Sequence, residues 1–144
     1  MRLYMDTSAL LKTVHVESES SALNAYLDEV TDEGTVLVTS SITIVELERA
    51  LRARVERVGP TPGGPPLRES VNWALAGLVE LRVTATVIRL ARWLGPPLLR
   101  SLDAIHLASA LLDGADGIVT YDRRLAEAAQ AANLAIHSPG SRCP

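Results

Sequence analysis

The sequence predicts an α/β fold built around a parallel β-sheet. Short runs with strand character alternate along the chain with longer runs of helical periodicity, and this alternation is typical of successive β–α–β units. The chain has 144 residues, which suits a single domain, and 47% of them are apolar, which is enough for a buried core. Because the chain contains no Phe, we expect that core to consist of Leu, Val, Ile and Ala.

Five segments have the length and composition of strands. Each is a run of four or five residues that is rich in apolar or β-branched side chains. The first of them, RLYM, leads straight into Asp6. The predicted strands are residues 2–5, 35–39, 81–85, 117–120 and 134–137.

Seven further segments have helical character. The longest begins after Ser40 and Ser41, which can provide its N-cap, and its apolar residues recur with helical spacing from Ile44 onward. Helices that connect parallel strands pack on the two faces of the sheet, so we expect both faces to be covered. The predicted helices are residues 8–14, 19–32, 41–58, 67–80, 86–94, 102–113 and 123–132.

The segment GPTPGGPP, residues 59–66, separates two of the predicted helices. It consists of Gly and Pro apart from Thr61, so it can neither continue a helix nor pair as a central strand. We expect a flexible surface loop and not a domain boundary, because neither side of it is a complete domain. The chain is therefore predicted to be one domain, residues 1–144, with a short C-terminal tail over residues 139–144.

The composition disfavours several classes of protein. No apolar run approaches the roughly 18 residues that a membrane span needs, and the acid at position 6 comes too early for a signal peptide, so we expect a cytoplasmic protein without a membrane partner. Cys143 is the only cysteine, which excludes an intramolecular disulfide and disfavours a thiolate metal site. The formal net charge of −3 argues against a protein that coats nucleic acid non-specifically.

Two acidic residues follow strands that can lie side by side in the sheet. Ligands of open parallel sheets bind beyond the carboxyl ends of the strands, and Asp6 and Asp122 each follow such an end. Both also suit the N-cap of the next helix, although Ser8 could cap the first helix and free Asp6 for other work. Thr120, near the same strand end, could orient Asp122. Local sequence leaves these alternatives open.

Two more acids lie on predicted helices. Asp103 would favour the dipole of its helix from the first turn, with Ser101 as the N-cap, and His106 shares its helix face. We expect His106 to be a hydrogen-bonded packing residue, because Mg²⁺ prefers oxygen ligands. Glu46 lies off the apolar stripe of its helix, and Glu48 lies nearer the edge of that stripe, so periodicity alone favours a solvated glutamate at position 46.

These residues together resemble a known family. The chain contains a strand running into Asp6-Thr7-Ser8, a V-E-L core at Glu46, D-A-I-H-L-A from Asp103 and T-Y-D-R-R-L from Thr120, in this order. This ordered set resembles the PIN-domain ribonucleases, specifically the VapC-type toxins of toxin–antitoxin pairs, over nearly the whole chain. The resemblance implies an α/β PIN domain with a five-stranded parallel sheet flanked by helices on both faces, and it selects Glu46 over Glu48.

The resemblance also implies an endoribonuclease that hydrolyses RNA phosphodiester bonds with Mg²⁺ or Mn²⁺. Four carboxylates in one pocket would repel each other and the RNA, and a hard divalent cation relieves both effects. Asp6 and Asp103 would be the main metal ligands, Asp122 would complete the set, and Glu46 would hold the metal or the attacking water, or deprotonate that water. The residues expected to orient these acids are Thr7, Ser8 and Thr120.

The expected partners follow from the same resemblance. A free toxin of this kind would harm its host, so we expect a VapB-type antitoxin that lays a helix near residues 41–58 and inserts a basic group at the acids. A homodimer is also expected. RNA contacts must come from local Arg side chains, each of which also suits a solvated helix surface. The candidates are Arg49, Arg52, Arg100, Arg123 and Arg124.

Other functions fit the residues less well. A haloacid-dehalogenase-like phosphatase needs a second Asp two positions after Asp6, where this chain has Ser8. A response-regulator receiver needs a lysine late in the chain, and Lys12 is the only lysine. The alternative that stays open is a catalytically silent PIN-like module that binds RNA or a protein.

Overall fold

The computed structural model describes residues 1–60 and 62–141, and these residues contain the predicted five-stranded parallel sheet. Its strand order is β3-β2-β1-β4-β5, and every pair of neighbouring strands is parallel. The predicted fold class is therefore confirmed. The strands are β1 (Arg2–Met5), β2 (Val36–Ser40), β3 (Val79–Leu81), β4 (Gly117–Val119) and β5 (Ala135–His137).

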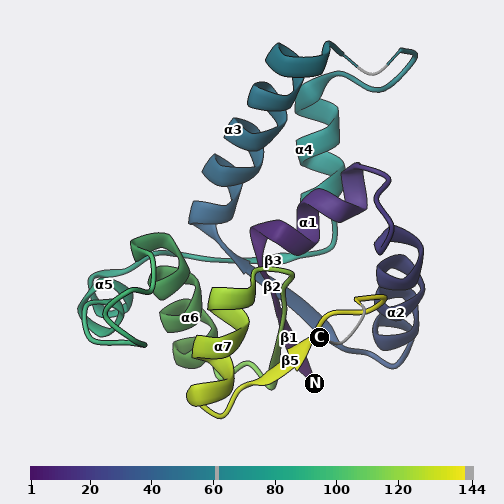
Figure 1. Ribbon diagram of the computed structural model, residues 1–144. Helices are drawn as coiled ribbons and strands as arrows, with labels where there is room; N and C mark the ends of the chain where they lie inside the picture. Colours follow the sequence, from purple (N-terminus) through teal and green to yellow (C-terminus); the bar gives the residue numbers. More distant parts are fainter. Residues whose placement is uncertain (61, 142–144) are drawn as a thin grey trace.

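Helices cover the two faces of this sheet (Figure 1). The four helices nearest the N-terminus lie on one side, and the other three lie on the opposite side, so the prediction that both faces are covered is confirmed. The helices are α1 (Thr7–Val14), α2 (Ser20–Asp32), α3 (Ser41–Val58), α4 (Leu67–Leu75), α5 (Ala85–Ala91), α6 (Ser101–Asp113) and α7 (Arg123–Ala131). No helix among the described residues has the length and apolar character to cross a membrane.

The alternation of side chains along β1 divides the core into two clusters. Leu3 and Met5 pack with residues of α1 to α4, whereas Tyr4, between them, packs with residues of α6 and α7. Successive residues of a strand point to opposite faces of the sheet, so this central strand is buried on both sides. The core also uses Met5 and Tyr4, which composition alone does not predict.

The order in which strands are added to the sheet reverses at β1, so the switch point of the topology lies between the neighbouring strands β1 and β4. The chain builds outward from β1 through β2 to β3, and then returns to place β4 on the other side of β1. Ligands of such sheets bind at this switch point, beyond the carboxyl ends of the two strands. The Asp6 amide donates to the Val119 carbonyl over 3.1 Å, so the ends of β1 and β4 are held together there.

One predicted strand and one predicted helix end are wrong. The third strand is Val79–Leu81 and not residues 81–85, because Thr84 caps α5 through its hydroxyl and the chain turns there. Helix α4 ends at Leu75 and not at residue 80, since Gly77 adopts a positive φ of 78° that a helix does not allow. The other predicted elements lie within three residues of their predicted ends.

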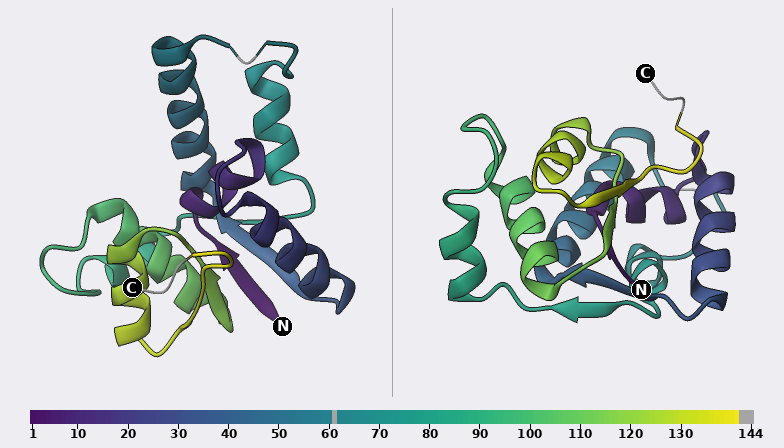
Figure 2. Two further views of the ribbon diagram at one scale, coloured as in Figure 1. Left: turned by 45° about the vertical axis from the view of Figure 1, so that its right-hand side comes forward. Right: turned by 90° about the horizontal axis from the view of Figure 1, so that it is seen from below.

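Helices α3 and α4 form a pair that extends away from the sheet. Figure 2 shows this pair, blue and teal, standing apart from the rest of the molecule in the left-hand view. The Ser40 hydroxyl caps α3 by accepting from the Ile42 amide, as predicted. The Gly/Pro segment joins the two helices at the tip, and its described residues, 59–60 and 62–66, form no helix or strand. Thr61, Cys143 and the end of the predicted tail lie outside the described residues.

Candidate active site

Asp6 lies at the carboxyl end of β1 and is almost fully buried, with 5% of its surface exposed. Its Oδ2 accepts hydrogen bonds from the Ser8 hydroxyl at 2.6 Å, the Ser8 amide at 3.2 Å and the Thr120 hydroxyl at 2.9 Å. Asp6 is thus the N-cap of α1, so of the two alternatives that the sequence left open, the cap is Asp6 and not Ser8. Helix α1 begins at Thr7, so Ser8 supplies an amide that needs a cap.

Asp122 lies beyond the neighbouring strand end and caps α7. Its Oδ1 accepts from the Arg124 amide at 2.8 Å and the Leu125 amide at 3.2 Å. The Thr120 hydroxyl accepts from the Asp122 amide at 3.1 Å while it donates to Asp6. Thr120 therefore joins the two strand ends, although it contacts the carboxylate of Asp6 and only the backbone of Asp122.

Asp103 reaches the same edge from the first turn of α6. Its Oδ2 is buried and has no hydrogen-bond partner among the described residues. Burial raises the pKa of Asp103, the charges of Asp122 and Asp6 raise it further, and Arg100 opposes them. Three aspartates from three elements thus act on one another at the switch point.

The N-cap position of α6 differs from the prediction. Arg100 occupies it and makes no side-chain capping bond, whereas Ser101 is already the first residue of the helix. The extended backbone of Arg100, with φ −65° and ψ 149°, places the helix start one residue after it. The predicted position of Asp103 in the first turn is confirmed.

Glu46 enters the site from α3 and is fixed through one of its oxygens. Glu46 Oε2 accepts from the Thr7 hydroxyl at 2.6 Å and lies 2.6 Å from His106 Nε2. His106 is 1% exposed, and its Nδ1 is hydrogen-bonded to the Tyr4 hydroxyl at 2.7 Å. The expected hydrogen-bonded packing role of His106 is confirmed, but its partner Glu46 was not predicted.

Glu46 and His106 each favour the ionised form of the other. Burial opposes the ionised form of Glu46, but the hydrogen bond and charge of His106 outweigh it and lower the pKa of Glu46. Burial likewise opposes the charged form of His106, but the hydrogen bond to Glu46 and the charges of Asp6, Glu46 and Asp103 raise the pKa of His106. Since His106 Nε2 is also 3.7 Å from Asp6 Oδ1, it connects Glu46 to the aspartates.

The predicted arginines are distributed over two regions. Arg100 precedes α6 and acts on the charge of Asp103, and Arg123 begins α7 directly after Asp122. Arg49 is exposed on α3, and no hydrogen bond or ion pair joins it to the four acids within the described part of the chain. Arg100 and Arg123 are thus near the acidic edge, whereas no such contact links Arg49 to it.

Comparison with known proteins identifies the family. The family model of the PIN domain matches residues 3–131. Ribonuclease VapC35 of Mycobacterium tuberculosis is 43% identical over 142 residues, which cover 96% of this chain and 97% of that protein. Ribonuclease VapC47 of the same species is 39% identical over 141 residues, which cover 96% of this chain and 98% of that protein. This chain belongs to the PIN-domain family of VapC ribonucleases.

Solved structures share this PIN fold at low sequence identity. The VapBC2 structure of Rickettsia felis, bound to a DNA fragment from its promoter, matches with a TM-score of 0.69 and 14% identity over 95% of this chain and 98% of that chain. VapC20 of Mycobacterium tuberculosis, described as a toxin that cleaves the sarcin–ricin loop, matches with a TM-score of 0.64 and 16% identity over 88% and 94%. At this identity the likeness concerns the fold.

The oxygen donors of this PIN domain suit a hard divalent cation that keeps part of its water shell. The buried Asp103 Oδ2, which has no described partner and is repelled by two other aspartates, is an atom that such a cation would satisfy. Among the described residues, no three His, Cys, Asp or Glu side chains are arranged to hold a metal ion together. Mg²⁺ takes oxygen ligands and keeps several waters, so the unpartnered Asp103 Oδ2 is the described atom that best fits such an ion.

Proposed function

We propose that this chain is a Mg²⁺-dependent endoribonuclease and the toxin of a type II toxin–antitoxin pair. The observation that carries the proposal is the meeting of Asp6, Asp103 and Asp122 at the switch point of the sheet, where Asp103 is half-buried under the repulsion of the other two. Mutual repulsion of this kind destabilises a site without a cation and favours binding of one. The VapC ribonuclease relatives support the reaction class.

On binding, the three aspartates would have to close around the cation, because the described side chains do not form a three-ligand set. Asp6 Oδ2 is occupied by the hydroxyls of Ser8 and Thr120, so Asp6 Oδ1 is the oxygen left to face a ligand. Asp103 would contribute its buried Oδ2, and Asp122 would contribute Oδ2, because its Oδ1 caps α7. Mn²⁺ would be accepted by the same oxygens. When bound, the cation offsets phosphate charge and lowers the pKa of a coordinated water.

Glu46 would align the attacking water. Thr7 and His106 both bond to Oε2, and no hydrogen bond to Oε1 occurs within the described residues, so Oε1 is free to accept from a water. The lowered pKa of Glu46, due to His106 against the effect of burial, keeps the carboxylate ionised and suits it to orienting that water. His106, held by Tyr4, and Thr7 fix the rotamer of Glu46, which limits the reorganisation that the reaction requires.

The same proposal includes a VapB-type antitoxin and a homodimer. The solved relatives include VapBC structures from Rickettsia felis and from nontypeable Haemophilus influenzae, which supports an antitoxin as partner of this chain. The antitoxin would lie against the α3 region and place a basic group at the acids. The positive charge of such a group would relieve the repulsion between the acids, as a bound metal ion would. Binding of antitoxin and of Mg²⁺ would then exclude each other.

The test is cleavage of a total-RNA pool by the purified chain, freed of antitoxin, with Mg²⁺ and with Mg²⁺ plus excess chelator. We expect discrete fragments with Mg²⁺ and none with chelator, and mapping of their ends would identify the target. Fragments that persist in chelator would contradict the metal dependence. A folded chain that yields no fragments in either condition would favour the silent RNA- or protein-binding module.

A further inference from the structure

Two exposed tryptophans mark two surfaces of different charge. Trp73 on α4 is 61% exposed, and Trp93, which follows α5, is 81% exposed. Burying an indole stabilises a complex strongly, so an exposed tryptophan indicates a binding surface when its neighbours suit a partner. Acidic side chains lie near Trp73, whereas basic side chains lie near Trp93.

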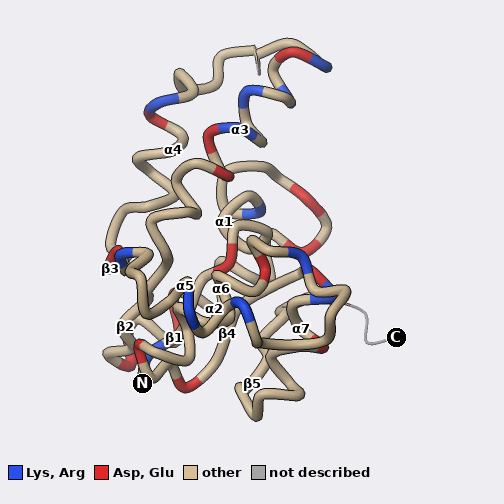
Figure 3. The backbone as a smooth tube through the Cα atoms, turned by 90° about the vertical axis from the view of Figure 1, so that its left-hand side faces the viewer, with Lys and Arg blue, Asp and Glu red and all other residues tan. Residues whose placement is uncertain are grey.

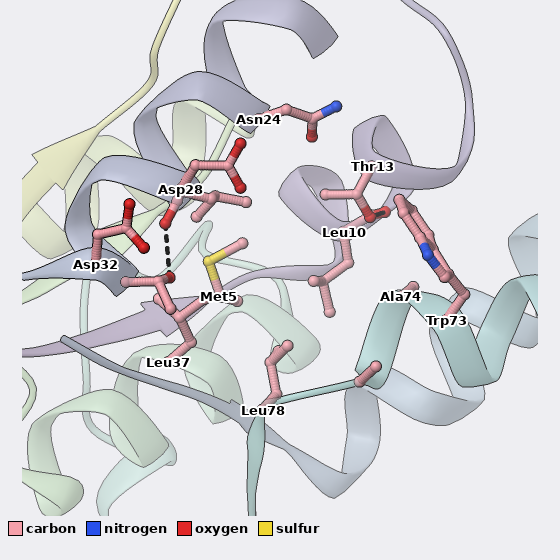
Figure 4. A pocket seen from close by; sticks show the side chains of 13 residues that line it. Met5, Leu10, Thr13, Asn24, Asp28, Asp32, Leu37, Trp73, Ala74 and Leu78 are labelled. Carbon is pink, nitrogen blue, oxygen red and sulfur yellow. Dashed lines mark hydrogen bonds between the residues drawn. The ribbon is translucent and has the colours of Figure 1, made fainter. Parts of the chain in front are cut away.

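Trp73 lines a pocket of about 530 Å³ between α1, α2 and α4. Figure 4 shows Trp73 on one side of this pocket and Asp28 and Asp32 of α2 on the other. Two carboxylates at the edge of an apolar pocket repel phosphate groups. The Trp73 pocket is therefore a poor place for nucleic acid.

Trp93 lies among arginines and other exposed apolar side chains. The guanidinium of Arg92 lies 5.8 Å from the centre of the Trp93 ring, and Leu98, five residues on, is 89% exposed. Both Arg92 and Trp93 line a pocket of about 490 Å³ between α5 and α6. An indole face next to a guanidinium is a combination that stacks nucleobases and holds phosphates.

A second pocket extends this surface toward the acids. It has a volume of about 780 Å³ and lies between residues 95–99 and α7. It shares Gly95, Pro96 and Leu99 with the pocket that Trp93 lines. Leu98 forms part of its apolar wall, and Arg123, Arg124 and one acid, Glu127, line it as well. These two arginines directly follow Asp122, so the basic end of the pocket adjoins the acidic edge.

Most arginines of this surface make no ion pair with a described residue. Within residues 1–60 and 62–141, one ion pair is recorded for them, between Arg123 and Glu127 at 3.8 Å on exposed side chains. Figure 3 shows blue positions close to α5 and α7 with red positions next to them. Exposed guanidinium groups with one long ion pair among them, lying beside an acidic site, attract a polyanion and orient it toward that site. We define the Trp93 face as Arg92, Trp93, Leu98, Arg100, Arg123 and Arg124.

We propose that the Trp93 face binds unpaired nucleotides of the RNA substrate that flank the scissile phosphate, with one base stacked on Trp93. The inference rests on the proposed function and names the part of the substrate that the chain recognises. Arg92 and Arg100 bind phosphates on the α5–α6 side, and Arg123 and Arg124 bind phosphates beside the acids. A base can reach the indole only when it is unstacked, so this surface selects single-stranded segments.

The experiment measures binding of a fluorescein-labelled, mixed-sequence single-stranded RNA of about 12 nucleotides in chelator, where no cleavage occurs. The variants are Trp93→Ala and, as a matched control, Trp73→Ala, since both remove an exposed indole. We expect Trp93→Ala to weaken binding about tenfold or more, and Trp73→Ala to leave it unchanged. An Arg92→Gln/Arg100→Gln variant should reduce the slope of log K against log salt by about 0.7 per lost phosphate contact.

Cleavage of total RNA with Mg²⁺, measured in parallel, separates this inference from the proposed function. If the wild type cuts and Trp93→Ala binds and cuts as well as the wild type does, the inference is wrong and the function stands. A wild type that binds RNA through Trp93 but never cuts would support RNA binding by the Trp93 face and contradict the nuclease. Equal RNA binding by both tryptophan variants, with an altered subunit number for Trp93→Ala, would assign the face to a second copy of the chain and overturn the inference.

Discussion

At the scale of single residues, Glu46 and Glu48 lie two positions apart on α3, but their burial and hydrogen bonds differ. Glu46 is half-buried and bonded to Thr7 and His106, whereas Glu48 is exposed. We predict that Glu46→Gln lowers the rate of RNA cleavage about 100-fold or more, because the amide replaces the charged acceptor for the attacking water. Glu48→Gln serves as the control and should cleave at the wild-type rate. Equal rates for both variants, measured on one mapped RNA, would refute the role of Glu46.

The hydroxyl of Thr7 offers a more selective test. We predict that Thr7→Val lowers kcat about 10- to 100-fold and leaves KM for RNA nearly unchanged, because it frees Glu46 without removing a charge. Thr13→Val on the same helix is the matched control, since its hydroxyl donates only to the Leu10 carbonyl, at 2.7 Å. A loss in both variants, with lowered thermal stability, would indicate damage to α1 instead.

Sequence reasoning could identify the acids but not their hydrogen bonds. Asp6 and Asp122 are candidate site residues from sequence because each follows the end of a predicted strand, although the local sequence also suits an N-cap at both positions. Glu46 is not, since helical periodicity favours a solvated side chain there, and only the family resemblance selects it. The bonds from Tyr4 and Glu46 to His106 join residues more than 50 positions apart, and no local pattern encodes such a contact.

At the scale of elements, the proposed function gives Asp122 two roles that substitution can separate. It caps α7 through Oδ1, and Oδ2 is the oxygen proposed to hold the cation. We predict that Asp122→Asn leaves the free energy of unfolding nearly unchanged, since Asn caps helices as well as Asp does, whereas Asp122→Ala lowers it by about 1 kcal/mol. Both should lose cleavage. Denaturant unfolding and a cleavage assay measure the two effects, and an active Asp122→Asn would restrict Asp122 to capping.

The elements that were predicted wrongly depend on competing local signals. Residues 81–85 have strand composition, but Thr84 also suits an N-cap, and the capping interaction is the one that forms. The true strand, Val79–Leu81, contains Glu80 and has exposed positions because it lies at the sheet edge. Strand composition is clearest in central strands, which explains why β1 and β4 were predicted better than β3.

At the scale of the whole molecule, three aspartates from different elements meet at one edge of the sheet, where burial and the charges of the other two raise the pKa of Asp103. We predict that Mg²⁺ raises the melting temperature, because a cation that binds only the folded chain stabilises it, by about 2.7 kcal/mol at 100 times its Kd. Asp103→Asn should melt no lower than the wild type in chelator, because it removes a repelling charge, and should lose the rise with Mg²⁺. Scanning calorimetry measures both, and a Mg²⁺ response that survives in Asp103→Asn would exclude Asp103 as a ligand.

The most direct test of the acidic site is single-turnover cleavage of a mapped RNA by Asp6→Asn in Mg²⁺. An Asn side chain can still accept from Ser8 and Thr120, so the variant should fold while it lacks a charge that holds the cation. Asp28→Asn, which removes an exposed acid of α2, is the control. We predict cleavage at the wild-type rate for Asp28→Asn and none for Asp6→Asn. Cleavage by a folded Asp6→Asn at the wild-type rate would contradict a metal-dependent nuclease site at the carboxyl ends of β1 and β4.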